Sequence, residues 1–442
     1  MLNEKILLDN FYATGNDFDK LRNIIEELKE VTEFRKCTSS DIAILSYLGQ
    51  SKETGRMYFC KNDIDTIDFV QDYILEQLKL SGIDLEDSDF EESHSRFEIS
   101  RKKIINSMKI EDVYKNGGFD ELINELKNTK FMIADSLGRL NFVSDNFLAT
   151  AERFGLKGNF LATPNVNRDS AIERQFVDDF KCTLVLKRYK NITKAFSLLS
   201  GKYQPIDQKV LFNIINALSK DESLGKPVCR KWEVTNFMTS VYIEFPKKAD
   251  ELQSFYGLSE KFVPGLWLAT SDTGHCSLKV RGTWRHKDSI TFDKEILKKH
   301  LGEIDIAKIV KEVENTIFAE YNKLPERLCE LMMQDIADPS WDLSTAGGQA
   351  KYFEKIKGIV KNVFEEIDML KAIGLRNRNS LFKQFTEEFD LTVNYTAYDL
   401  ATGILNFPER VEVAAKDNFM KACGVSPYAN YEVKKEEELL LL

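Results

Sequence analysis

The sequence has little proline and glycine, and it has no long hydrophobic run. Nine prolines and 22 glycines among 442 residues are too few for a collagen-like or low-complexity protein. No stretch of about 18 consecutive apolar residues occurs, so the sequence predicts no membrane-spanning helix. The first ten residues, MLNEKILLDN, lack the basic and then apolar segments of a secretory signal. With 43% apolar and 30% charged residues, the composition predicts a globular protein of the cytoplasm, which is the host cytoplasm if a phage encodes it.

Cysteine and histidine are also scarce, with seven and four residues respectively. The number of cysteines is odd and no two are spaced as CxxC, which argues against a disulfide scaffold and against a cysteine-rich zinc site. We therefore expect buried, reduced thiols. His275 and Cys276 are adjacent, and adjacent strand residues point to opposite faces, which weakens this pair as a joint metal site.

Familiar catalytic motifs are absent from the sequence. It contains no GxxxxGK[ST], no strand-linked GxGxxG, no HExxH and no GxSxG. The sequence therefore predicts no catalytic residues, no metal and no cofactor. A non-enzymatic protein is the preferred interpretation, and an enzyme with an unfamiliar site remains an alternative.

Charge is distributed unevenly along the chain, whose formal net charge is −10. Residues 1–100 hold 22 acidic and 11 basic side chains, whereas residues 181–232 hold 11 basic and three acidic ones. The whole-chain pI of about 5.3 conceals this basic segment. An acidic start and a locally basic middle suggest two different surfaces.

Hydrophobic periodicity divides the chain into three regions of an α+β protein. These are an acidic helical N-terminal region (1–130), a core with a mixed antiparallel sheet (131–292), and a helical C-terminal region with a short tail (293–442). Apolar residues at helical spacing predict helices within the ranges 18–32, 64–81, 96–128, 144–156, 171–180, 208–220, 306–318 and 350–373. β-branched and aromatic runs predict strands within 131–143, 182–189, 194–200, 231–246 and 265–285. Asp272-Thr273-Gly274 is a turn signal, and we expect a hairpin tip there with Gly274 at positive φ.

Basic and aromatic residues interleave in three strand-like stretches of the predicted core. Cations neutralise phosphates and aromatic rings stack on bases, and single-strand binders combine these two devices. An alternative is a sheet whose exposed face carries lysine and whose buried face carries aromatics. The candidate nucleic-acid-binding residues are Lys187, Arg188, Tyr189, Lys190, Arg230, Lys231, Lys279, Arg281, Trp284 and Arg285.

Four segments, in order, resemble a family of phages, prophages and plasmids. They are NFVSDNFLATAERFGLKGNFL, KAFSLLSGKYQPIDQKVLFNIINAL, GLWLATSDTGHCSLKVRGTWR and VNYTAYDLATGILNFPERV. On these, residues 130–415 resemble the phage/plasmid-like protein family of unknown function, of the YfjQ and YafZ type. The matching residues include Ser200, Tyr203, Pro205, Asp207, Thr396, Ala397 and Tyr398. The family's Cys-Asn pair is missing after Trp284-Arg285, and residues 1–120 have no counterpart. The resemblance implies a mobile-element protein linked to DNA metabolism, and it implies no catalytic residues.

The preferred hypothesis is a non-enzymatic, DNA-associated protein of a phage or mobile element. It would bind or anneal single-stranded DNA in recombination or replication. The alternative is a protein–protein interaction protein, a structural phage component or an antagonist of host defence that uses the acidic N-terminal region. No membrane partner is expected, and a homo-oligomer is left open.

Overall fold

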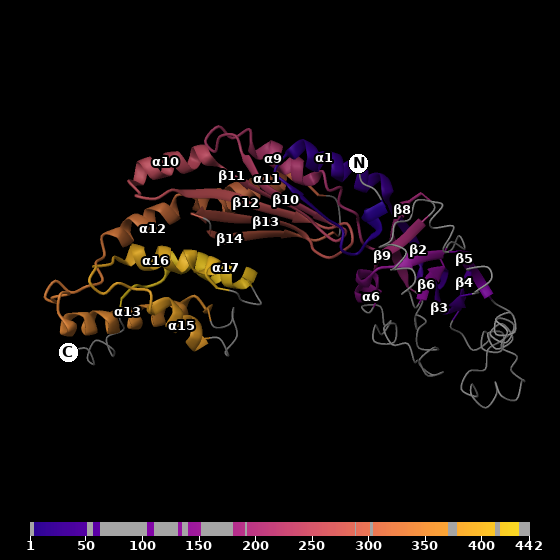
Figure 1. The fold of residues 1–442 in the computed structure, drawn as a ribbon. Coiled ribbons are helices and arrows are strands. Elements are labelled where there is room, and N and C mark those ends of the chain that lie inside the picture. The colour runs from indigo at the N-terminus through magenta and orange to yellow at the C-terminus, as the bar shows by residue number, and fades with distance from the viewer. Residues whose placement is uncertain are drawn as a thin grey trace, which may run out of the picture.

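Two β-sheets, with helices at both ends of the chain, make up the α+β structure, which confirms the predicted fold class (Figure 1). The computed structural model describes residues 4–50, 56–61, 104–109, 131–134, 140–151, 180–190, 192–287, 289–300, 304–369, 378–411 and 416–432. Within these ranges, no helix combines the length and apolar character that a membrane span requires.

The first sheet is antiparallel and has six strands in the order β1-β10-β11-β12-β13-β14. Its strands are β1 Tyr12–Gly15, β10 Val228–Thr235, β11 Thr239–Glu244, β12 Phe262–Thr270, β13 Leu278–His286 and β14 Ser289–Lys298. Side chains alternate between its two faces. One face carries apolar residues such as Val241, Leu268, Val280 and Trp284, and we call it the core face. The other, the polar face, carries Lys231, Tyr242, Glu244, Trp267, Arg281 and Arg285.

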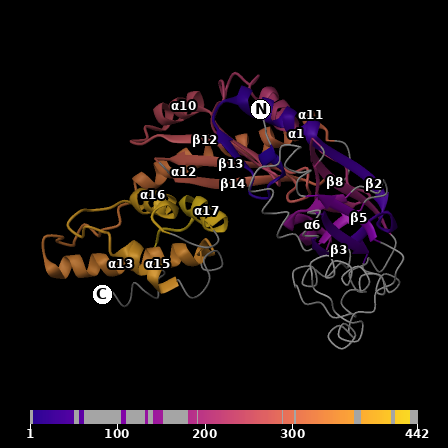
Figure 2. The same cartoon turned by 45° about the vertical axis from the view of Figure 1, so that its right-hand side comes forward.

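The second sheet has eight strands in the order β2-β8-β9-β7-β6-β3-β4-β5, and β7 runs parallel to β9. Its strands are β2 Thr32–Thr38, β8 Lys181–Tyr189, β9 Ile192–Ser200, β7 Leu140–Val143, β6 Phe131–Ala134, β3 Ala43–Gln50, β4 Arg56–Lys61 and β5 Ile104–Lys109. The two sheets lie side by side (Figures 1 and 2). Strands β1 and β2 pair with β10 and β8, so the first forty residues contribute to both sheets.

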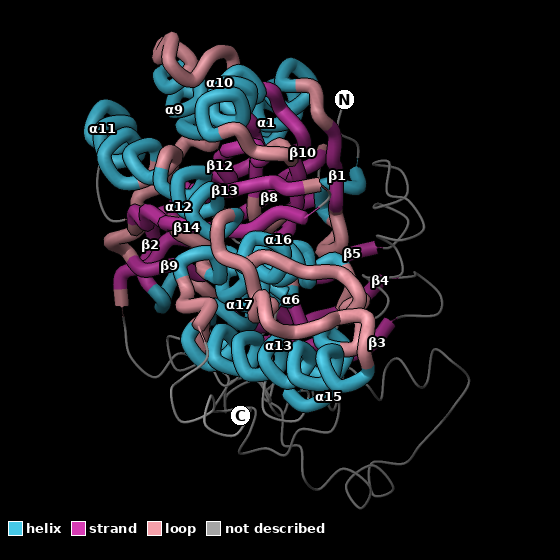
Figure 3. Tube along the Cα trace, turned by 90° about the vertical axis from the view of Figure 1, so that its left-hand side faces the viewer, coloured by secondary structure: helices cyan, strands magenta, loops and turns pink. Residues whose placement is uncertain are grey.

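Helices lie on both sides of the first sheet (Figure 3). Four of them, α1 Phe18–Val31, α9 Val210–Leu218, α10 Pro246–Tyr256 and α11 Ile306–Thr316, contribute to the same hydrophobic core as the core face. Two others, α16 Ala397–Asn406 and α17 Lys416–Gly424, pack against β14, which is the edge strand farthest from β1. The remaining helices are α6 Asp145–Ala151, α12 Lys323–Met332, α13 Ala346–Glu366 and α15 Arg378–Thr386.

Several sequence predictions are confirmed and others are wrong. The helix expected within 18–32 is α1, and its N-cap Asp17 accepts hydrogen bonds from the backbone of the first turn. The helix expected across 96–128 is wrong at Ile104–Lys109, which forms strand β5. The C-terminal region was expected to be helical from about 293, but strand β14 continues to Lys298. The helix expected within 64–81 lies outside the described residues, and so does the helix expected within 171–180 except for Phe180, which is not helical.

The turn between β12 and β13 joins the two sheets. Gly274 has φ 73°, as predicted, and a side chain there would overlap Leu199 of β9. Ser197 Oγ donates to the carbonyl of Thr273 at 2.6 Å. Tyr203 donates its hydroxyl to the carbonyl of Ser271 at 3.1 Å. The turn that carries part of the family resemblance therefore has a structural role.

Candidate functional site

The ten candidate residues lie on two different sheets. Lys187, Arg188, Tyr189 and Lys190 lie at the end of β8 in the second sheet, whereas the other six belong to β10 and β13 of the first. Lys187 is 1% exposed, and its ammonium donates to the backbone carbonyl (3.2 Å) and side-chain oxygen (3.0 Å) of Asn236. Burial lowers the pKa of Lys187. The structure thus corrects the prediction for Lys187, because a phosphate cannot reach a lysine that is buried and hydrogen-bonded.

The neighbours of Lys187 form a local cluster at the β8–β9 turn. Arg188 Nε donates to Thr193 Oγ1 at 3.4 Å. Lys190, with φ 52°, places its ammonium 5.3 Å from the centre of the Tyr189 ring. These contacts fold the basic side chains back onto the turn itself.

Trp284 belongs to the core face, and this corrects its expected role in base stacking. Its side chain is 4% exposed and packs edge-on against Tyr321, with ring centres 5.4 Å apart. Arg281 and Arg285 point to the opposite face because strand residues alternate. A base cannot stack on the Trp284 ring while the core is intact.

The polar face brings Arg230 and Arg285 together on one buried carboxylate. Glu244 has a fully buried side chain (0% exposed) at the end of β11. Arg285 donates Nε to Oε1 at 2.5 Å and Nη2 to Oε2 at 3.1 Å, and Arg230 donates Nε to Oε2 at 2.7 Å. Tyr242 donates its hydroxyl to Oε1 at 2.8 Å. Burial alone would raise the pKa of Glu244, but these hydrogen bonds outweigh burial and hold the pKa below its ordinary value.

A pocket of about 360 Å³ opens beside this cluster. Its charged lining consists of the cations Arg230, Lys261, Arg285 and Lys287 and the carboxylates Glu244 and Glu260, together with His286. Cations therefore outnumber carboxylates by two. Such a lining favours an anion, since the buried Glu244 is paired with two arginines and the half-buried Glu260 with Lys287, although Lys261 is paired with Asp250 outside the lining.

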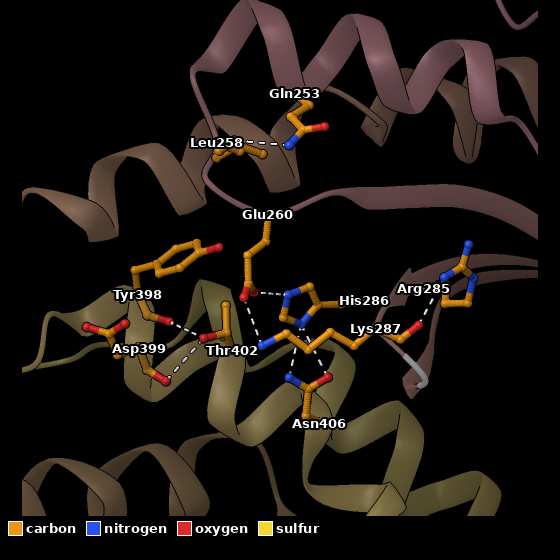
Figure 4. A network of polar contacts seen from close by, with 10 residues as sticks. All are labelled: Gln253, Leu258, Glu260, Arg285, His286, Lys287, Tyr398, Asp399, Thr402 and Asn406. Atoms are coloured by element: carbon orange, nitrogen blue, oxygen red, sulfur yellow. Dashed lines mark hydrogen bonds and ion pairs between the residues drawn. The ribbon is translucent and has the colours of Figure 1, made fainter. Parts of the chain in front are cut away.

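One lining residue of the pocket, His286, contacts the C-terminal helix α16 (Figure 4). His286 contacts the Glu260 carboxylate through Nε2, and its Nδ1 lies 3.0 Å from Asn406 Nδ2 on α16. Its ring stacks on Phe262, with centres 4.3 Å apart. Burial lowers the pKa of His286, which favours a neutral ring that donates to Glu260 and accepts from Asn406. Lys287 also pairs with Glu260, at 2.8 Å.

One row of cross-strand partners runs over the polar face beside the pocket, and it includes an aromatic residue that the sequence prediction missed. Lys231, Tyr242, Trp267, Arg281 and Glu295 stand opposite one another on β10 to β14. Arg281 lies over the Trp267 ring, 4.9 Å from its centre, and forms an ion pair with Glu295. It is 6% exposed, so the structure corrects its predicted role as a phosphate contact, as it does for Lys187. Trp267 is half-buried and lines a smaller pocket of about 140 Å³. Trp267, rather than Trp284, is the tryptophan on the face that carries the arginines.

These contacts place Arg230 and Arg285 on one carboxylate beside the pocket. Within the described residues, no three histidine, cysteine or carboxylate side chains are grouped so that they could hold a metal ion. Comparisons with protein-family models, with curated proteins and with solved structures find no match to this chain. The resemblance to phage/plasmid-like proteins therefore stays a prediction, and the function rests on the site.

Proposed function

We propose that this protein is a non-enzymatic, mobile-element protein of DNA metabolism that holds single-stranded nucleic acid on the polar face of the first sheet. The observation that carries the proposal is the pair of arginines, Arg230 and Arg285, fixed by the buried Glu244 at the edge of a cation-rich pocket. A guanidinium held by one carboxylate keeps its planar fork oriented, and that geometry suits a phosphate oxygen.

The exposure of the arginines supports a phosphate-binding role. The Arg230 side chain is 49% exposed although its Nε is engaged with Glu244. Guanidinium has five N–H donors, so an arginine bound to a carboxylate through one edge can present another to a ligand. A phosphate entering the pocket would displace water and would leave the internal ion pairs intact.

The Lys231–Tyr242–Trp267–Arg281 row supports a single strand rather than a duplex. Residues two apart on a strand share a face and are about 7 Å from each other. Tyr242 of the row is two residues from Glu244 on β11, so the row passes about 7 Å from Glu244. A single strand can place one phosphate near Arg230 and turn an unpaired base toward Trp267. A duplex keeps its bases stacked inside and has no base to offer this ring.

The test is the binding of a fluorescent oligothymidine by the full chain, measured by anisotropy at several salt concentrations. We expect affinity to fall as salt rises, because phosphate contacts release counterions. Replacing both Arg230 and Arg285 by alanine should weaken binding. It should also reduce the salt slope, which is the slope of log K against log salt concentration, by the contribution of about two phosphate contacts.

Arg22→Ala is the matched control for this test. Arg22 lies on α1, its side chain is 50% exposed and it pairs with Asp19 at 2.9 Å, so it matches Arg230 in charge and exposure, although its partner is exposed whereas Glu244 is buried. The control should bind as the unmodified chain does. An unchanged salt slope in the Arg230/Arg285 double variant, or the same loss in Arg22→Ala, would reject the polar face as the binding surface.

The alternative of an acidic interaction surface concerns residues that lie mostly outside the described ranges. It is left as an outcome of the same experiment. If the full chain does not bind single strands at low salt, the interaction hypothesis replaces this proposal.

A further inference from the structure

Two cysteines that are 145 residues apart in the sequence stand directly opposite each other in the second sheet. Cys37 of β2 and Cys182 of β8 are cross-strand partners in an antiparallel pair. Their sulfur atoms are 3.5 Å apart. Neither sulfur is in a disulfide, and a disulfide needs the sulfurs to approach to about 2.05 Å, so a small side-chain rotation separates the reduced pair from a bond.

The surrounding backbone holds the two cysteines in this position. Beyond the pair, the backbone N–H of Ser39 donates to the Phe180 carbonyl at 2.9 Å. The N–H of Phe180 donates in turn to Ser39 Oγ at 3.1 Å. Strands β2 and β8 are therefore hydrogen-bonded beyond the cysteines as well as along their paired residues, and a shift in their register would break these hydrogen bonds.

The two thiols differ in exposure and in acidity. Cys182 is buried, whereas Cys37 is half-buried. The adjacent Cys182 thiol lowers the pKa of Cys37, because a hydrogen bond to its sulfur stabilises the thiolate. A thiolate is the nucleophile in thiol chemistry, so Cys37 is the residue that an oxidant would meet first.

We propose that Cys37 and Cys182 form a reversible oxidation site, which hydroperoxides convert to a disulfide between β2 and β8. The Cys37 thiolate attacks one peroxide oxygen, the O–O bond breaks, and hydroxide leaves and takes up a proton as water. The Cys182 sulfur then attacks the sulfenic acid of Cys37, and the S–O bond breaks with loss of a second water. Overall, two thiols and one hydrogen peroxide give one disulfide and two waters. A dithiol reductant reverses the bond.

The bond would connect β2, which follows α1, to β8 of the second sheet. The closed loop contains all of β3 to β7, so the disulfide constrains most of the chain that builds this sheet. Such a cross-link restricts the unfolded chain, and the oxidised protein should therefore melt at a higher temperature than the reduced one.

The experiment treats the reduced full chain with hydrogen peroxide, blocks remaining thiols with an alkylating reagent and digests the protein with trypsin without reduction. Cleavage after Lys36 and Lys52 and after Lys181 and Lys187 gives one peptide beginning at Cys37 and one beginning at Cys182, each with a single cysteine. We expect mass spectrometry to find these two peptides linked, and to find them separate after reduction. The melting temperature, measured on the same samples, should rise on oxidation.

Variants assign the roles of the two thiols. Cys182→Ser should stop the reaction at a sulfenic acid on Cys37, which a dimedone probe detects. Cys37→Ser should form no linked peptide. Cys329→Ser, which removes a half-buried thiol on α12, should form the linked peptide as the unmodified chain does. Two results from the unmodified chain alone would overturn the proposal: alkylation of both Cys37 and Cys182 after peroxide treatment, or a cross-link from Cys37 to a different cysteine.

Discussion

Replacing Trp267 and Trp284 by alanine, one at a time, tests whether the polar face is the working surface. The two tryptophans lie on adjacent strands of one sheet and face in opposite directions. Trp284 packs on Tyr321 in the core, while Trp267 contacts Arg281 on the polar face. The same chemical change therefore removes a core residue in one variant and a half-buried residue of the polar face in the other.

The expected magnitudes follow from these environments. Trp284→Ala leaves a cavity in the core and should lower the free energy of unfolding by about 3–5 kcal/mol. Trp267→Ala removes a half-buried ring and a cation–π contact, and should cost about 1–2 kcal/mol of stability. If a base stacks on Trp267, the same variant should lose about 1–3 kcal/mol of binding energy, which is a roughly 5- to 150-fold rise in Kd.

The assay combines urea unfolding with oligothymidine binding at a temperature where both variants are folded. We expect Trp284→Ala to unfold at lower urea with an unchanged Kd for the folded protein. We expect Trp267→Ala to bind weakly while its salt slope stays the same, since no phosphate contact is lost. Weak binding by a stable Trp284→Ala, together with normal binding by Trp267→Ala, would refute the assignment of the two faces.

Three further predictions concern single residues. Gly274→Val should lower the free energy of unfolding by more than about 1 kcal/mol in urea titrations, because Gly274 combines positive φ with a close neighbour; Gly257→Ala, at φ 64° with open space around it, should cost less. Burial lowers the pKa of His300 to about 4. Between pH 6.5 and about 4, His300 is therefore protonated in the unfolded chain and neutral in the folded chain. The free energy of unfolding should fall by about 3 kcal/mol as pH falls through this window. His300→Phe keeps a ring stacked on Tyr203 and should flatten this part of the stability–pH curve. A curve as steep as that of the unmodified chain would contradict the assignment to His300. Glu244→Gln should cost about 3–5 kcal/mol of stability, because both arginines lose their buried charged partner, and it should weaken single-strand binding, because the guanidinium groups are no longer held in place; unchanged binding by the folded variant would contradict the orienting role of Glu244.

Local patterns in the sequence were sufficient to predict several helices and turns, but not which residues meet on the polar face. Helix α1 and the β12–β13 turn were predictable because apolar spacing, an N-cap aspartate and a glycine at a turn act within a few residues. Strand β5 was not, because Ile104–Lys109 pairs with β4, a strand far from it along the chain, and such pairing has no local signal.

The placement of Trp284 was within reach of the sequence. Strand alternation puts Trp284 opposite to Arg281 and Arg285, so a single predicted strand already separates the ring from the cations. Glu244 and Trp267 were beyond reach, because they meet the arginines through cross-strand pairing. Register between strands depends on loops and on irregularities such as the bulge between Cys229 and Lys231, and a single sequence does not encode these in any local signal.

The position of the first forty residues determines how the acidic N-terminal charge can be studied. A chain that began near residue 120 would lose β1 from the edge of the first sheet and β2 from the edge of the second. It would also lose α1, which packs on the core beside β10 through the hydrogen bond from Trp232 Nε1 to the Asp17 carbonyl at 2.9 Å. Weaker binding by such a truncated chain would therefore report unfolding rather than the removal of competing charge. Point substitutions on exposed acids of α1 change the charge while the strands stay paired, so they are the sound way to ask whether the acidic residues oppose the approach of nucleic acid.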